Sequence, residues 1–245
     1  MNPILEMAKN RFKAKKVIAV MSAKGGVGKS TIASLIALNL SERQKTALID
    51  LDIYGNSTLK LFGINKLHEV SKEGIEPFLV ENLSLFSIGG LVGDHYVVLP
   101  GKDEGNVVES LLGLANVKED LVVIDTPPGM GEELLTLSRV LNPEIYLVTL
   151  PSKLSLKIVK HMLDYLLELG LKPKMILANM SFLDTANGRI YPFGELEPVK
   201  ELGEEFDIRV ECLPFDPSIE EFVGRIQDYN GVLKEGIARF LICQE

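Results

Sequence analysis

The chain has 245 residues, of which 26 are basic and 34 acidic, so its formal net charge is −8. Hydrophobic residues make up 46% and charged residues 24%, which is typical of a folded globular protein and excludes a disordered one. The acidic balance argues against nucleic acid as a partner, because non-specific binding to phosphates needs many lysines and arginines. At this length a single α/β domain covering residues 1–245 is favoured over two smaller domains with thin cores.

Cysteine usage and the absence of a long apolar run both favour a cytoplasmic protein. Cys212 and Cys243 are far apart in the sequence and cannot form a disulfide framework, which indicates a reducing compartment. No apolar run reaches the roughly 20 residues that a membrane span needs, so no stable membrane association is expected. Residues 1–16 carry their charges after the apolar positions, the reverse of a signal peptide, and are predicted to form an N-terminal arm or surface helix.

Short apolar runs alternate with helical stretches along the chain. The runs lack polar alternation, so they are predicted to be strands that are covered on both faces, as in a parallel sheet. Alternation of strands and helices defines the expected fold class: α/β, a doubly wound, mostly parallel sheet with helices on both faces, in three layers. The expected strands are 17–21, 47–51, 121–124, 145–150, 175–178 and 208–213, with 83–88 as a weaker candidate. The expected helices are 30–43, 106–114, 132–141, 154–169, 199–206 and 231–242.

The strongest functional signal follows the first strand, at the sheet edge where such folds bind ligands. The sequence KGGVGKST leads directly into a helix with apolar periodicity. Its glycines let the backbone point N–H groups at phosphate oxygens, and the helix start adds a positive dipole end. The residues predicted to bind the phosphates of ATP are Gly25, Gly26, Val27, Gly28, Lys29, Ser30 and Thr31.

Individual roles follow from the phosphate-loop pattern. Lys29 is expected to bridge the β- and γ-phosphates, and the Ser30 hydroxyl to bind Mg²⁺. The general pattern has glycine where this chain has Ala23, so the match is to a variant loop that carries an additional lysine, Lys24. We therefore interpret the segment as a phosphate-binding loop of this variant type.

Aspartates stand at the ends of two further strands. Asp125 caps an apolar run in the arrangement that holds Mg²⁺ through water. Asp50 and Asp52 leave the second run on one face and need a cation nearby, which Mg²⁺ and lysines would supply. The predicted metal ligands are Ser30, Asp52 and Asp125, while Asp50 is either support for this site or a structural acid. After Asp125 come Thr-Pro-Pro-Gly, and the amide of Gly129 is expected to contact the γ-phosphate.

These motifs resemble the MinD/ParA superfamily of P-loop ATPases with a deviant Walker A loop, and within it the Mrp-type (ApbC-like) branch. The resemblance covers residues 17–225 and rests on VIAVMSAKGGVGKST, LIDLDIYGNS, LVVIDTPPGMGEE, LANMSF and CLPFDPSIEE, in that order. It implies a sandwich homodimer in which Lys24 reaches the nucleotide held by the partner subunit. It also implies that Asp52 orients or deprotonates the attacking water, that Asn179 contacts adenine, and that Pro214 packs near the base. The resemblance thus makes Lys24, Lys29 and Asp52 the catalytic set.

The same branch is implicated in iron–sulfur cluster assembly, and many members hold a [4Fe–4S] cluster through a C-x-x-C pair after N-M-S. In ungapped register, Thr185 and Gly188 occupy those positions here, and neither supplies the thiolate that a cluster requires. Cys212 is expected to be a small buried side chain in a strand, and Cys243 lies at the C-terminal edge. The resemblance implies apo iron–sulfur clients as partners, while a cluster bound to this chain is doubtful.

Two other functions remain open from the sequence: a ParA/MinD-type positioning ATPase that binds a surface reversibly, and an adaptor that binds nucleotide and barely hydrolyses it. Hydrolysis is expected to be slow and stimulated by dimer closure or a client. The stretch 231–243 has only two basic residues and is predicted to dock onto the domain rather than onto a membrane. Residues 63–114 are expected to form long loops around a partner-facing insertion. His68, His95 and His161 are dispersed, without metal-binding spacing.

Overall fold

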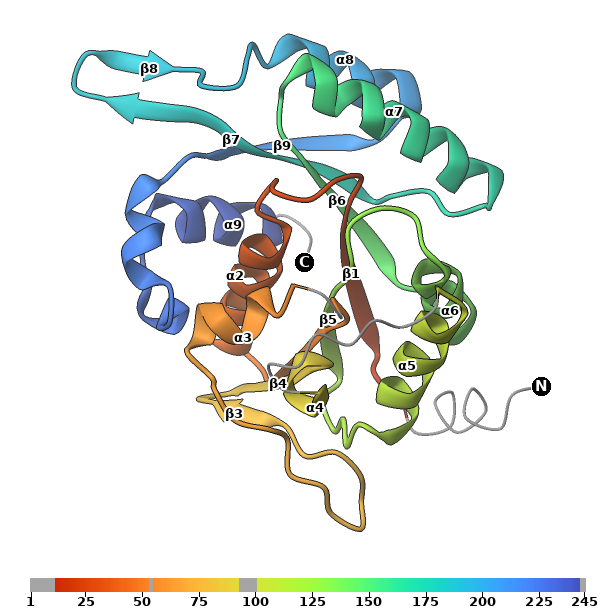
Figure 1. Cartoon of the computed structure of the whole chain (residues 1–245). Helices are drawn as coiled ribbons and strands as arrows, with labels where there is room; N and C mark the ends of the chain where they lie inside the picture. Colours follow the sequence, from red (N-terminus) through yellow and green to blue (C-terminus); the bar gives the residue numbers. More distant parts are fainter. Residues whose placement is uncertain (1–11, 53–54, 93–100, 243–245) are drawn as a thin grey trace.

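The computed structural model describes residues 12–52, 55–92 and 101–242. Within these residues nine strands form one sheet in the order β3-β4-β2-β5-β1-β6-β7-β8, with β9 also paired to β7 (Figure 1). The pairs β3–β4 and β7–β8 are antiparallel and the others are parallel, which confirms a mostly parallel sheet. The strands are β1 (Lys16–Ser22), β2 (Thr46–Asp50), β3 (Phe78–Val80), β4 (Leu83–Ser87), β5 (Leu121–Asp125), β6 (Glu144–Thr149), β7 (Met175–Thr185), β8 (Gly188–Ile190) and β9 (Arg209–Pro214).

Helices cover both faces of this sheet, as expected for a doubly wound fold. Helices α2 and α9 pack against each other on one face, and α5 with α6 and α7 with α8 form pairs on the other (Figure 1). The helices are α2 (Lys29–Ser41), α3 (Ser57–Phe62), α4 (Gly89–Val92), α5 (Gly101–Leu114), α6 (Glu132–Leu141), α7 (Lys153–Glu168), α8 (Glu197–Phe206) and α9 (Val232–Ile242). Two 3₁₀ turns, Pro217–Phe222 and Ile226–Asp228, lie between β9 and α9.

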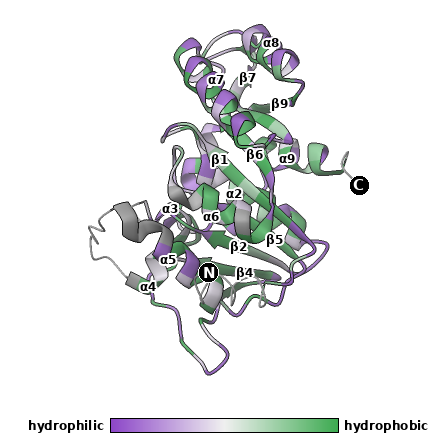
Figure 2. Ribbon diagram, turned by 90° about the vertical axis from the view of Figure 1, so that its right-hand side faces the viewer, coloured by the Kyte–Doolittle hydropathy of each residue, from purple (hydrophilic) through white to green (hydrophobic). Residues whose placement is uncertain are grey.

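The two faces are built from alternate residues of the same strands. In β1, Ile18 and Val20 pack into the core under α2 and α9, whereas Ala19 and Met21 pack into the core under α7. Side chains that alternate across a strand, all of them apolar, require cover on both sides. Figure 2 shows the result: hydrophobic strands between helices whose outer surfaces are hydrophilic. The apolar runs therefore predicted the central layer correctly.

The weaker strand candidate is a fully buried strand, β4, and its serines explain why the pattern was obscured. The Ser84 hydroxyl donates to Glu119 at 2.5 Å, and the Ser87 hydroxyl donates to Asp50 at 3.0 Å. Hydrogen-bonded hydroxyls can be buried at little cost. The expectation of long loops over 63–114 is therefore wrong, because β3, β4, α4 and α5 lie within that range.

The last two predicted strands, at 175–178 and 208–213, differ from the sequence expectation. The strand predicted at 175–178 continues to Thr185 and pairs with β8, forming a hairpin that extends beyond the sheet (Figure 1). The strand β9 was expected to be covered on both faces, but among the described strands it pairs only with β7, and Arg209 at its start is exposed. As an edge strand it is covered less completely, so Cys212 is half-buried rather than fully enclosed.

The two ends of the described chain are attached to the core. Phe12 is buried in the core under α5, and the Lys15 N–H donates to the Asp120 carbonyl at 2.7 Å, so the part of the 1–16 arm that the structure describes is anchored. In α9, Leu233 and Ile237 are buried beside α2, which confirms that this helix docks onto the domain. Within the described residues, no helix has the length and apolar character needed to cross a membrane.

Candidate functional site

The loop between β1 and α2 forms the wall of an open pocket. Gly26 and Gly28 have φ values of +77° and +82°, a left-handed conformation that glycine adopts without strain. A pocket of about 350 Å³ lies against this loop. The pocket brings together most of the predicted site, namely Gly25, Gly26, Gly28, Lys29, Ser30, Thr31 and Asp52. Val27, also predicted to bind the phosphates, does not line the pocket among the described residues, and its side chain is buried in the core.

Lys29 joins the loop to the strand-end acid Asp125. The Lys29 ammonium lies 2.5 Å from Asp125 Oδ1 and 3.5 Å from the Ser30 hydroxyl, and both charged side chains are buried. The other carboxylate oxygen of Asp125 accepts a hydrogen bond from the Thr58 hydroxyl at 3.2 Å. The ammonium thus lies between the phosphate loop and a carboxylate. That it neutralises a bound phosphate stays a prediction.

Asp50 and Asp125 are cross-strand neighbours at the ends of β2 and β5, and both are fully buried. Burial, with a further contribution from the charge of Asp125, raises the pKa of Asp50 to about 7. The Asp52 backbone N–H, at 3.0 Å, and the Ser87 hydroxyl both donate to the Asp50 carboxylate. Asp50 does not line the pocket within the described chain, so the structure favours its role as support for the segment that carries Asp52.

Asp52 lies in the pocket itself, and its Oδ1 accepts the Gly55 N–H at 2.9 Å. Together with the Ser30 hydroxyl and Asp125 it gives a donor set made only of oxygen, which suits Mg²⁺. The Ser22 hydroxyl also lines the pocket; it is buried and has no hydrogen-bond partner among the described residues. A buried hydroxyl of this kind fits a site built for a polar ligand.

The segment after Asp125 approaches the pocket from the side of β5. Pro128 lines the pocket, and the Gly129 N–H donates to the Ser22 carbonyl at 2.8 Å. Contact between this amide and a γ-phosphate would require that hydrogen bond to break. The role of Gly129 in sensing the phosphate therefore stays a prediction, now with a specific hydrogen bond that must be exchanged.

Asn179 lies within β7 and contacts the phosphate loop. Its Nδ2 donates to the Val27 carbonyl at 2.9 Å, while its Oδ1 is buried without a partner among the described residues. A Cβ on Gly28 would collide with Asn179 Nδ2, which its hydrogen bond to the Val27 carbonyl holds in place, so both this close approach and the positive φ favour glycine there. This contact links β7 to the loop across 152 residues of sequence.

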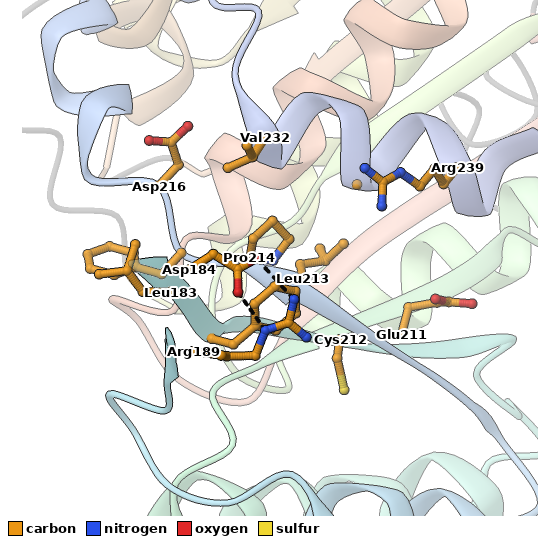
Figure 3. Close-up of a pocket in the computed structure, with 13 residues that line it drawn as sticks. Leu183, Asp184, Arg189, Glu211, Cys212, Leu213, Pro214, Asp216, Val232 and Arg239 are labelled. Carbon is orange, nitrogen blue, oxygen red and sulfur yellow. Dashed lines mark hydrogen bonds and ion pairs between the residues drawn. The ribbon is translucent and has the colours of Figure 1, made fainter. Parts of the chain in front are cut away.

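Pro214 lies in a different pocket from the phosphate loop. That second pocket, about 490 Å³, is bounded by the β7–β8 hairpin, β9 and α9 (Figure 3). Arg189 pairs with Asp184 across the hairpin at 2.7 Å and lies over the ring of Phe182, in a position that Figure 3 shows below Pro214. Pro214 thus lines the second pocket, whereas Asn179 is buried behind the phosphate loop and lines neither pocket. The base-binding role of the pair stays a prediction.

The residues at the expected cluster-binding positions do not fit an iron–sulfur cluster. Thr185 and Gly188 form the turn of the β7–β8 hairpin, where the Thr185 hydroxyl donates to the Gly188 carbonyl at 2.7 Å. Burial raises the pKa of the half-buried Cys212 thiol, which disfavours the thiolate that binds iron. The described residues hold no group of three or more histidine, cysteine, aspartate and glutamate side chains arranged for a metal ion. Cys243 and His95 lie outside the described residues.

Helix α3 supplies site residues that the sequence reasoning missed. Ser57, Lys60 and Leu61 line the pocket, and Thr58 binds Asp125. The helix has only six residues, too few to show apolar periodicity. The available signal was position alone: the helix starts a few residues after Asp52, at the same end of the sheet.

Comparison with known proteins identifies the family of this chain. The family model described as ParA: NUBPL iron-transfer P-loop NTPase matches residues 13–231. An iron-sulfur cluster carrier protein of Rickettsia felis is 36% identical over 177 residues, covering 71% of this chain and 56% of that protein. A protein of the same description from Saccharolobus solfataricus is 33% identical and covers 83% and 72% of the two chains. The chain thus spans little more than half the length of some curated relatives.

Solved structures show the same architecture. A nucleotide-binding protein from Archaeoglobus fulgidus, described in complex with ADP, has a TM-score of 0.79 and 30% identity, covering 94% of this chain and 96% of that one. The cell division ATPase MinD of Pyrococcus furiosus has a TM-score of 0.67 at 18% identity, covering 94% of this chain and all of that one, and so shares the fold. The fold and pocket define a P-loop nucleotide-binding protein. The chain belongs to the ParA/NUBPL iron-transfer P-loop NTPase family.

Replacing Gly28 with alanine is expected to distort the phosphate loop. The new Cβ would collide with Asn179 Nδ2 and would force a non-glycine residue to φ +82°. We expect a loss of about 1–3 kcal/mol in the free energy of unfolding, measured by urea denaturation without nucleotide. Gly25→Ala is the matched control, because nothing lies within 4 Å of its added Cβ. Equal stability of the two variants would contradict the close packing of Asn179 on the loop.

Proposed function

We propose that this protein is a nucleotide-switch ATPase that binds and hydrolyses Mg²⁺-ATP as a sandwich dimer and acts in iron–sulfur cluster carriage or related metallochaperone work. One observation carries the proposal: the glycine loop, Ser30 and Asp52 line the same pocket, and the buried Lys29–Asp125 ion pair lies beside it. The names of the relatives support the iron–sulfur part.

The pocket residues divide the work of hydrolysis. Backbone N–H groups of the loop and the Lys29 ammonium hold the phosphates and neutralise their charge. Ser30, Asp52 and Asp125 are the residues that would hold Mg²⁺, and a bound Mg²⁺ would supply positive charge to neutralise the phosphate oxygens. The Asp52 carboxylate orients the attacking water and accepts its proton. The Asp50 carboxylate accepts a hydrogen bond from the backbone N–H of Asp52 and so holds the backbone of Asp52 in place.

A second subunit completes the site in this proposal. Lys24 is half-buried on the phosphate loop and, within the described chain, does not line the pocket beside it. It is therefore available to reach the nucleotide of the partner subunit. Hydrolysis that waits for this lysine is slow in the monomer and stimulated by dimer closure or a client. Asn179, through its unpartnered Oδ1, and Pro214 are the candidates for contact with adenine.

The iron–sulfur cluster enters this proposal as cargo, not as a resident group. The C-x-x-C thiolate pair of many Mrp-type proteins is absent here, because Thr185 and Gly188 stand at its positions and Cys212 is half-buried. A cluster would therefore need ligands from Cys243, from the second subunit or from the client. Apo iron–sulfur proteins are the proposed clients, and the cytoplasm is the proposed location. The name of an Anopheles gambiae relative, cytosolic Fe-S cluster assembly factor Nubp2 homolog, 31% identical, supports both.

Anaerobic reconstitution with iron and sulfide tests the cargo. A stable brown chromophore with a fixed iron-to-dimer ratio, released to an apo iron–sulfur protein in an ATP-dependent manner, would support a carrier. Cys243→Ser and Cys212→Ser variants, measured side by side, show whether either thiol is a ligand. Absence of the chromophore in the wild type, together with ATP-dependent binding to vesicles, would instead favour a positioning ATPase of the ParA/MinD type. ATP turnover that stays negligible with every client would favour a nucleotide-binding adaptor.

A further inference from the structure

A buried hydrogen-bond path connects the acid pair with the loop 63–77, which joins α3 to β3 and projects from the body of the domain (Figure 1). The Ser87 hydroxyl donates to Asp50 Oδ2 at 3.0 Å. The Ser87 backbone N–H donates to His68 Nε2 at 3.0 Å, and His68 Nδ1 lies 2.9 Å from the Glu76 carbonyl. The path therefore runs from a strand-end acid to both ends of the projecting loop.

The contacts of His68 fix the state of its ring. A backbone N–H can only donate, so Nε2 is the acceptor nitrogen, and Nδ1 carries the proton that is donated to the Glu76 carbonyl. Both ring nitrogens are satisfied only in this one neutral tautomer. Protonation of Nε2 would place two donors against each other at Ser87.

Packing also holds the ring in place. The imidazole stacks on Phe78 with 4.0 Å between the ring centroids. The backbone N–H of His68 donates to the Gly90 carbonyl at 2.8 Å. A Cβ on Gly90 would lie 2.6 Å from the His68 ring, so the glycine makes room for it. The side chain is thus enclosed, with 8% of the residue exposed. A histidine on a largely exposed loop is here part of the core.

The path continues from Ser87 to the candidate general base. The Ser87 hydroxyl accepts the Gly89 N–H at 3.1 Å, which leaves its hydrogen directed at Asp50. Asp50 Oδ1 in turn accepts the backbone N–H of Asp52. Each hydrogen bond in the path restrains the next group, and the last restrains the residue that lines the pocket.

We propose that His68 is a positioning residue for ATP hydrolysis: through Ser87 and Asp50 it holds the backbone of Asp52, and it thereby couples the projecting loop 63–77 to the nucleotide pocket. His68 touches neither the pocket nor the phosphate loop, so it acts only through these residues. The proposal rests on the proposed ATPase function for its kinetic readout. Its second readout, the protection of the Asp52 amide, does not depend on ATP hydrolysis.

His68→Phe separates the hydrogen bonds of the ring from its packing. Phenylalanine keeps an aromatic ring against Phe78 but leaves the Ser87 N–H and the Glu76 carbonyl without their partner. We expect kcat for ATP to fall about 10-fold while KM changes less than about 3-fold, because the contacts with ATP are intact. His68→Gln, which can both accept and donate, should recover part of kcat. His161→Phe, on the exposed surface of α7, is the matched control.

Two further measurements distinguish positioning from folding alone. In His68→Ala, free imidazole should restore kcat in a saturable manner, since it can refill the space and both hydrogen bonds. Hydrogen exchange of the peptide covering residues 50–55, measured without nucleotide, should be faster in His68→Phe than in the wild type. A folded His68→Phe with unchanged kcat and unchanged exchange would overturn the proposal. Equal kcat values for His68→Gln and for His68→Ala without imidazole would also overturn it. If the wild type hydrolyses no ATP, the proposed function fails, and the exchange measurement alone decides the coupling.

Discussion

Lys29→Ala is expected to weaken ATP binding by at least about 100-fold, because it removes the buried cation that we propose neutralises the phosphates. Loss of one partner from such a desolvated charge pair costs about 2–5 kcal/mol. The same change leaves Asp125 buried without its ammonium partner, 2.5 Å away in the structure. We therefore expect the free energy of unfolding to fall by about 3–5 kcal/mol. Calorimetric titration with ATP and chemical denaturation of the free protein measure the two effects.

A second substitution separates these two effects. In Lys29→Ala combined with Asp125→Asn, the uncompensated carboxylate is gone, so stability should recover in large part while ATP affinity should not. Lys172→Ala is the control, since it removes a lysine whose ion pair with Asp207 is exposed and worth about 0–1 kcal/mol. An unchanged ATP affinity in folded Lys29→Ala would show that the glycine loop does not bind the phosphates.

Asp52→Asn is expected to slow ATP hydrolysis about 100-fold while ATP stays bound, because general-base catalysis typically contributes 10²- to 10⁴-fold. The amide oxygen of asparagine can still accept the Gly55 N–H, so the local backbone should be preserved. What the variant loses is a carboxylate able to accept a proton from water. Single-turnover hydrolysis, measured beside a binding titration in the same buffer, separates the chemical step from affinity.

Two comparisons make the Asp52 result specific. Asp164→Asn changes an exposed acid on α7 and should leave the rate unchanged. Asp50→Asn keeps a side chain that can accept from Ser87 and from the Asp52 N–H, and should slow hydrolysis less than Asp52→Asn does. Turnover at the wild-type rate in Asp52→Asn would remove this residue from the mechanism.

Local sequence patterns predicted the parts of the site that local chemistry determines. The glycine loop, Lys29, Ser30 and Asp52 were identified because each belongs to a short motif at the end of an apolar strand. The structure brings these residues to one pocket. The pairing of Asp50 with Asp125 followed less directly, because their register depends on how β2 and β5 align.

Contacts between distant segments could not be predicted from the same patterns. The hydrogen bond from Asn179 to the Val27 carbonyl spans 152 residues, and nothing near Asn179 indicates its partner. The burial of His68 depends on Gly90 and Phe78, which only the folded sheet brings together. The open edge of β9 was missed because a strand at the border of a sheet can still have an apolar sequence.

The strand β7, which continues from the sheet into the hairpin, is irregular where it passes the phosphate loop. Met180 adopts φ +52°, within a register irregularity between Ala178 and Phe182, and such bulges bend a strand. Asn179, at the same bend, is tied to the phosphate loop, whereas the hairpin lies on the other side of it. A small tilt at the bend is amplified with distance along the hairpin. We therefore expect the tip, Thr185–Gly188, to move further than the residues next to the bend when the phosphate loop shifts.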